Sequence, residues 1–441
     1  MFLFCLLLSF SGTANAQTII RDTEIENALR TWAAPIFTAA GLVPDNVNII
    51  LIQNSGINAF VAGGANIFIY TGLLEKAENP GEVIGVIAHE TGHISGGHLI
   101  RLRKSFEQAS YETIIGTILG IGAAVLSGEG GAATAIISGT QNVATSRFLS
   151  NSRLNESSAD QAGLKFMNAA HFDPKGLLTF MEKLEGQELL PQSQQMEYVR
   201  THPLTANRME ALRTKVEQSP YAGTNVPARW TGDFARMKAK LMGFTRPEQV
   251  QWQYKDDDHS IAALYARAIA AYKTNHVAEA LRLSDELLAK EPGNPYFYEL
   301  KGQMLVDFSL IDESLPAYRK AVELAPRADL IRIAYAHALI ESAGLNSQFE
   351  KLEEAIEQLA IARRTEKKST RIYRLLATAY GRLGNEVSAR LNLAEEAVLQ
   401  RRLPDAKRFA TYVIENSQEN NSENIRAKDI LKYVEEIEKD S

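Results

Sequence analysis

The stretch that decides the fold is Val83–His98, V-I-G-V-I-A-H-E-T-G-H-I-S-G-G-H. It contains His-Glu-x-x-His as His89, Glu90 and His93, and the apolar run before them predicts a helix whose first half is buried. Residues four apart lie on one face of a helix, so both imidazoles can bind a single ion. Glu90 is then placed where it can contact a water on that ion. Zinc suits this pattern because it accepts neutral imidazole and tolerates three protein ligands with one open position.

A third ligand is expected on a second helix that faces the first. The segment Asn155–Asp160, N-E-S-S-A-D, places Glu156 and Asp160 four residues apart and therefore on one helix face. Glu156 can complete the coordination of the metal. Asp160 can accept a hydrogen bond from the outer ring nitrogen of a ligand histidine, which fixes its tautomer. Two solvated carboxylates are the alternative, but the apolar residues around them favour a functional role.

The composition is that of a globular protein. The 441 residues predict two or three domains, and 45% hydrophobic with 23% charged residues argues against disorder. A net charge of −6 argues against nucleic acid as a partner, since phosphate binding needs a basic face.

The first sixteen residues predict a secretory signal peptide. An apolar core is followed by Ala14-Asn15-Ala16, a small-x-small cleavage site, although the usual basic start is missing. We expect cleavage after Ala16 and a periplasmic location. The only cysteine, Cys5, would leave with the signal, so the mature chain would have no disulfide.

The residues before the metal motif predict a helix and a small sheet. Residues 23–40 have helical periodicity, and residues 47–53, 57–62 and 66–70 read as short strands. The last of these strands could be a sheet edge that pairs with an extended peptide, or simply a packed strand.

An apolar segment rich in small residues follows the metal motif at residues 111–140. A run of Gly, Ser and Glu divides it into halves that are each too short to span a bilayer. We interpret it as a helical hairpin buried over the site, with peripheral membrane contact, or insertion of an embedded enzyme, as alternatives.

The C-terminal part of the chain is repetitive. Small residues recur 34 positions apart at Ala268 and Gly302 and at Ala280 and Ser314, and Pro292 closes the second helix. This is the tetratricopeptide pattern, in which each repeat is a helix-turn-helix and the array is an α-solenoid with a concave face. A generic helical bundle is the alternative. Gly, Pro and charged residues at 221–258 predict the domain linker before it.

The two motifs together resemble the M48 family of zinc metallopeptidases. The resemblance covers about residues 22–216, whereas the repeats are matched only by type. It implies a mainly α fold: an α+β zincin-type peptidase domain with a small β-sheet, followed by the α-solenoid. We therefore expect a signal peptide at 1–16, the peptidase domain at 17–220, the linker at 221–258 and the repeats at 259–441.

The resemblance also implies a role for each site residue. One zinc ion per chain would be bound by His89, His93 and Glu156. Glu90 would be the general base, and Asp160 the hydrogen-bond partner of a ligand histidine.

The family also carries a His and an Arg downstream of the glutamate helix, and His202 and Arg208 stand in those places. Both are candidate donors to the oxyanion of the reaction. His202 has a second candidate role: it could occupy the open zinc position and keep the free enzyme inactive.

Two functions from different classes remain. The first is an exported zinc endopeptidase whose repeats recruit protein clients. By resemblance, these clients are unfolded or misassembled outer-membrane β-barrel proteins and their assembly machinery. The second is a chaperone-like or adaptor repeat protein whose metal site is structural or silent. An intact Glu90 favours the first, because a structural site has no use for a base.

Overall fold

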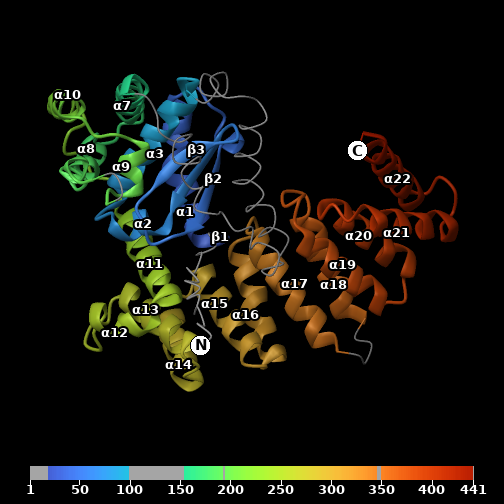
Figure 1. The fold of residues 1–441 in the computed structure, drawn as a ribbon. Helices are drawn as coiled ribbons and strands as arrows, with labels where there is room; N and C mark the ends of the chain where they lie inside the picture. Colours follow the sequence, from blue (N-terminus) through green and yellow to red (C-terminus); the bar gives the residue numbers. More distant parts are fainter. Residues whose placement is uncertain (1–17, 99–152, 192–193, 345–348, 441) are drawn as a thin grey trace, which may run out of the picture.

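The computed structural model describes residues 18–98, 153–191, 194–344 and 349–440. The described part is mainly helical, with one small sheet near the N-terminus and a long helical array at the C-terminus (Figure 1). The predicted signal peptide and the predicted hairpin at residues 111–140 lie outside the described residues. Within the described ranges, no helix has the length and apolar character needed to cross a membrane.

The sheet has four strands in the order β1-β2-β4-β3. They are β1 (Thr18–Ile20), β2 (Asn48–Gln53), β3 (Ala59–Ala62) and β4 (Asn66–Tyr70). β2 and β4 are parallel, and β1 and β3 add antiparallel on the two sides. Of the two interpretations of the last predicted strand, the structure confirms the packed strand and not the edge, because β4 lies between β2 and β3. In the described chain, β3 is the edge strand on that side.

Helix α1 (Thr23–Ala39) covers the sheet and supplies much of the core. It begins at Asp22, whose side chain accepts a hydrogen bond from the Ile25 amide. Its buried face includes Leu29 and Trp32, which pack in one cluster with strands β2–β4 and with α3.

The metal motif lies on α3 (Pro80–Ser95), and three signals set its start and end. Asn79 caps the first turn by accepting from the Glu82 amide, and Pro80 occupies the first helical position. Every residue from Val83 to His93 is buried. The helix ends at Ser95, and Gly97 beyond it adopts a positive φ of 63°.

The remaining elements of this half are short helices around α3. They are η1 (Pro44–Asn46), α2 (Thr71–Lys76), α7 (Arg153–Ala169), α8 (Lys175–Glu182), η2 (Gln187–Leu189), α9 (Glu197–Thr201) and α10 (Ala206–Glu217). Of these, α7 and α8 make the most extensive contacts with α3.

The segment predicted as a linker contains a long, well-packed helix, α11 (Ala228–Thr245). Trp230 and Phe234 join the core of the N-terminal half, where both rings pack against Trp32. On the other side, Ala239 packs with Ala266 of the first repeat helix. Two short turns of helix, η3 (Pro247–Gln249) and α12 (Val250–Gln253), follow it.

The helical array runs from α13, below the sheet in the view of Figure 1, to α22 at the far end of the molecule. Its helices are α13 (Ile261–Lys273), α14 (Val277–Lys290), α15 (Pro295–Asp307), α16 (Ile311–Leu324), α17 (Asp329–Ala343), α18 (Phe349–Ala362), α19 (Thr370–Arg382), α20 (Glu386–Leu399), α21 (Leu403–Asn416) and α22 (Ser422–Asp440). Glu366, between α18 and α19, pairs with Arg21 beside β1. The repeated small residues pack between neighbouring helices. A Cβ added to Gly302, for example, would lie 2.9 Å from the ring of Tyr318. The fold class predicted from the sequence is confirmed.

Candidate metal centre

Two glycines bring helices α3 and α7 into backbone contact. A Cβ added to Gly92 of α3 would lie 2.6 Å from the carbonyl oxygen of Ala159. A Cβ added to Gly163 of α7 would lie 3.1 Å from the backbone of Ala88 and His89. This close packing compensates for the helix propensity that glycine lacks. It also places the carboxylates of α7 directly against the histidines of α3.

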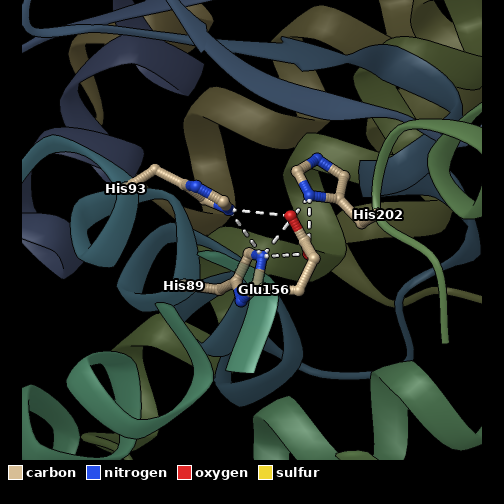
Figure 2. A group of neighbouring side chains, drawn as sticks. All are labelled: His89, His93, Glu156 and His202. Carbon is tan, nitrogen blue, oxygen red and sulfur yellow. Dashed lines mark hydrogen bonds and ion pairs between the residues drawn. The ribbon is translucent and has the colours of Figure 1, made fainter. Parts of the chain in front are cut away.

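The structure brings His89, His93, Glu156 and His202 together in one buried cluster (Figure 2). One ligand atom from each residue lies within 4.8 Å of the others. The Nε2 atoms of His89 and His93 are 3.1 Å apart. The Glu156 carboxylate lies 3.4 Å from each of these atoms and 3.2 Å from Nδ1 of His202.

These distances fit a tetrahedral metal ion. Four donors at about 2.0–2.1 Å from a metal lie about 3.3–3.4 Å from one another. The local charge fits a dication as well. Three carboxylates lie at the site: Glu156 and Asp160 contact the guanidinium of Arg208, and Glu90 contacts His202. One guanidinium against three carboxylates among these residues leaves two negative charges for a cation to neutralise.

Each histidine of the cluster is oriented by a contact to its outer ring nitrogen. His89 Nδ1 lies 2.9 Å from Oδ1 of Asp160, and His202 Nε2 lies 3.0 Å from the carbonyl oxygen of Ala59 on β3. His93 Nδ1 lies 2.9 Å from Nδ1 of His98. Protons on these outer nitrogens leave the inner lone pairs free to bind a metal.

Glu90 lies beside the cluster but has no hydrogen-bond partner among the described residues. Both of its carboxylate oxygens are fully buried, and Oε1 is 3.5 Å from Nε2 of His202. Burial raises the pKa of this carboxyl. A buried carboxylate without a donor is costly, and a bound water would supply one. That position suits a group that accepts a proton.

Arg208 is held behind the cluster rather than in it. Its Nε and one terminal nitrogen donate to the two oxygens of Asp160 at 2.7 and 2.9 Å. The other terminal nitrogen donates to the carbonyl oxygen of Pro203 and lies 3.1 Å from Glu156. The guanidinium is therefore committed to protein partners. A chain of contacts runs from Arg208 through Asp160 to His89.

The protein carboxylates favour positive charge at the cluster. Burial opposes charge on His89, yet hydrogen bonds to Asp160 and Glu156 raise the pKa of its imidazole to about 10. Burial likewise opposes charge on Asp160, but hydrogen bonds from His89 and Arg208 hold its pKa below the ordinary value.

The structure therefore unites all seven residues singled out from the sequence, whose individual roles stay predictions. It adds others that the sequence did not indicate. One of them is His98, whose ring contacts a ligand candidate, His93. Tyr198 is fully buried, with its ring centroid 4.6 Å from that of His202. No sequence motif marks His98 or Tyr198, because their contacts depend on how the loops that carry them fold back onto α3.

Residues 20–216 match the model of Peptidase family M48. The chain is similar to the beta-barrel assembly-enhancing protease of Escherichia coli (strain K12), with 26% identity over 314 residues. That alignment covers 69% of this chain and 63% of the relative. The protein of the same name from Yersinia pestis is 28% identical over 291 residues, which are 64% of this chain and 58% of the relative.

A putative beta-barrel assembly-enhancing protease of Vibrio cholerae serotype O1 is 23% identical over 402 residues. This alignment covers 90% of the chain and 81% of the relative. The chain spans less than two thirds of the length of the Escherichia coli and Yersinia pestis relatives.

Proposed function

We propose that the chain is an exported, zinc-dependent endopeptidase, because residues 20–216 match the model of Peptidase family M48. The observation that carries the proposal is the position of Glu90, which is buried beside four convergent ligand atoms and has no donor within the described ranges. The name shared by the similar proteins supports a role in the quality control and assembly of outer-membrane β-barrel proteins.

The proposed ligands are His89, His93 and Glu156, with one zinc ion per chain. When bound, zinc would polarise the scissile carbonyl and lower the pKa of a water. Glu90 would accept a proton from the attacking water and return it to the leaving amine. Asp160 would hold the ring of His89 in the ligating tautomer.

His202 supplies a fourth ligand atom, which would complete a tetrahedral site. A catalytic site needs an open position for water or substrate. We therefore favour the role in which His202 blocks the free enzyme and moves away when substrate binds. Donation to the oxyanion is the alternative role, and it also requires the ring to leave its present place.

Arg208 fits a positioning role better than that of an oxyanion donor. Its Nε and both terminal nitrogens already contact Asp160, Pro203 or Glu156 in this arrangement. Its effect on catalysis would then pass through Asp160 to His89.

The proposed organisation is a signal peptide cleaved after Ala16, the peptidase domain at 17–220, a connecting segment at 221–258 and repeats at 259–441. The repeats would recruit unfolded or misassembled outer-membrane proteins and parts of their assembly machinery in the periplasm. A concave array of helix pairs is the usual architecture of such a binding surface.

The competing function is an adaptor whose metal site is structural or silent. The two are separated by measuring zinc content and casein cleavage for the wild type and for Glu90→Gln. We expect equal zinc in both and loss of about 10²–10⁴-fold in cleavage by the variant. Equal cleavage, or a wild-type protein that binds no metal in excess zinc, would reject the peptidase.

Client identity needs a second experiment. The full chain with Glu90→Gln should bind substrates without cutting them, so proteins recovered with it from the cell envelope are candidate clients. Enrichment of outer-membrane β-barrel proteins over other envelope proteins is the expected result.

A further inference from the structure

The turn between α18 and α19, together with the first residues of α19, is strongly basic in a chain that is acidic overall. Residues 363–374 read R-R-T-E-K-K-S-T-R-I-Y-R, against a net charge of −6 for the whole chain. Glu366, the only carboxylate in this run, is bound by Arg21 at 2.6 Å. Arg374 is bound to Glu396. The other cations of the run have no ion-pair partner among the described residues.

Two of these cations line a pocket of about 560 Å³ near the C-terminal end of the array. Arg363 and Lys367 form one wall, and Tyr373, Asn392 and Arg426 are among the other lining residues. Both cations are exposed, whereas Tyr373 and Asn392 are buried. The pocket therefore combines free positive charge with fixed polar and aromatic groups.

The carboxylates that line this pocket are already engaged by the protein. Glu395 accepts two hydrogen bonds from Arg426, and Glu423 accepts one from Ser388. They do not neutralise the wall formed by Arg363 and Lys367. A ligand that carries a carboxylate would find that wall unpaired.

A second pocket lies on the other side of the Glu395–Arg426 ion pair, since both residues line the two pockets. Its volume is about 240 Å³, and Val398, Ile430 and Tyr433 give it an apolar surface. Tyr433 is 47% exposed, which leaves much of its ring available for contact. An apolar side chain could bury area there.

We propose that these adjoining pockets bind an acidic and apolar segment of a partner protein. Its Asp or Glu side chains would pair with Arg363 and Lys367. A neighbouring Leu or Phe would pack against Val398, Ile430 and Tyr433. This deepens the proposed function, on which it rests, by assigning part of the client-binding surface of the repeats.

The observations favour a peptide over other anionic partners. The cations line a recess between helices rather than a protruding surface of the kind that contacts a membrane. The apolar second pocket has no counterpart in a nucleic-acid backbone.

The test is fluorescence anisotropy with the full chain carrying Glu90→Gln, so that the probe is not cut. The probe is a short labelled peptide in which Asp and Glu alternate with Leu and Phe. Its counterpart has Asn and Gln in place of the acids. We expect the acidic probe to bind, the amide probe to bind at least about tenfold more weakly, and added salt to weaken the acidic probe.

The double variant Arg363→Glu with Lys367→Glu should weaken the acidic probe by about tenfold or more. Tyr433→Ser should weaken it separately. The matched control is Lys290→Glu with Arg327→Glu, which reverses two exposed cations of earlier repeats and should leave affinity unchanged. Thermal melting of each variant is the control for folding, and we expect these exposed substitutions to leave the melting temperature unchanged.

Equal binding by the two double variants, or no binding of the acidic probe, would overturn the proposal. Binding of anionic phospholipid vesicles that depends on Arg363 and Lys367, without peptide binding, would reassign the pocket to a membrane surface. Casein cleavage by the wild type is measured in parallel. A failed peptide site with intact cleavage is thereby distinguished from failure of the peptidase itself.

Discussion

Gly92 of α3 and Ala159 of α7 are in such close contact that a Cβ on Gly92 would lie 2.6 Å from the Ala159 carbonyl oxygen. No real Cβ occupies that position, and the obstacle is backbone, which cannot rotate away. The spacing of these two helices sets the distance from the histidines of α3 to the carboxylates of α7. A change at Gly92 therefore tests whether helix spacing controls metal binding.

Gly92→Ala should force the helices apart and lower the free energy of unfolding by about 1–3 kcal/mol, with reduced zinc occupancy. The control is Gly232→Ala on α11, where the nearest atom to an added Cβ is a flexible Arg236 nitrogen at 4.0 Å. That change should be neutral or stabilising by about 0.4–1 kcal/mol. Denaturant unfolding and zinc analysis measure both, and similar behaviour of the two variants would contradict the expectation.

Asp160→Asn should weaken metal binding and the fold together. Without the negative charge of Asp160, the ring of His89 is held less firmly in its ligating orientation. Arg208 is also left buried without its counter-ion. We expect about a 10–100-fold loss in zinc affinity and about 3 kcal/mol of destabilisation. Competition with a chelating dye and thermal melting provide the two readouts.

The control for Asp160 is Glu279→Gln, which breaks an exposed i,i+3 pair with Arg282. Exposed pairs contribute about 0–1 kcal/mol, so this variant should resemble the wild type. If Asp160→Asn were equally mild, the chain of contacts from Arg208 to His89 would have no role in holding the site.

His202→Ala should raise peptidase activity, because it vacates the fourth position around the metal. A ring that occupies this position about 90% of the time would lower activity about tenfold, and its removal should restore that factor. Cleavage of casein at matched zinc content is the measurement. His276→Ala, at an exposed helix start among the repeats, is the control. A fall to background would instead identify His202 as a donor to the oxyanion.

Glu299 of α15 should make stability depend on pH. Burial, together with the charges of Asp22 and Glu24, raises its pKa from 4.5 to about 7, although Lys240 opposes the rise. Between these values the folded chain holds a proton that the unfolded chain releases. Stability should therefore fall as pH rises from about 4.5 to 7 and then level off.

Glu299→Gln should remove this dependence and be more stable than the wild type at pH 8 by about 3 kcal/mol. Denaturant unfolding at several pH values measures it. Glu323→Gln, at an exposed position, is the matched control and should keep the wild-type slope. If the free energy of unfolding changed with pH in the same way for the wild type and both variants, Glu299 would be ionised over the whole pH range.

Local patterns predicted most of the elements that form the candidate site. The spacing of His89 and His93 follows from helix geometry, and so does the pairing of Glu156 with Asp160. The repeats could be predicted equally well from the sequence, because small residues recur at a fixed offset. Strand β1 was missed because three residues carry no periodicity.

What the sequence could not supply was the set of contacts between distant segments. The Ala59 carbonyl reaches His202 only because β3 lies at the edge of the sheet, and that strand order has no local signature. His98 contacts His93 only because the chain turns at Gly97, where the backbone φ is positive. The basic pocket likewise needs α19, α20 and α22 to pack together before its charges meet.

The position of α11 has a practical consequence for dividing the chain. Trp230 and Phe234 complete the N-terminal core, whereas Ala239 of the same helix belongs with the first repeat. A fragment ending at residue 220 would expose the surface of Trp32 that these rings cover. A fragment ending at 258 would retain it, so a separately expressed protease half should extend at least that far.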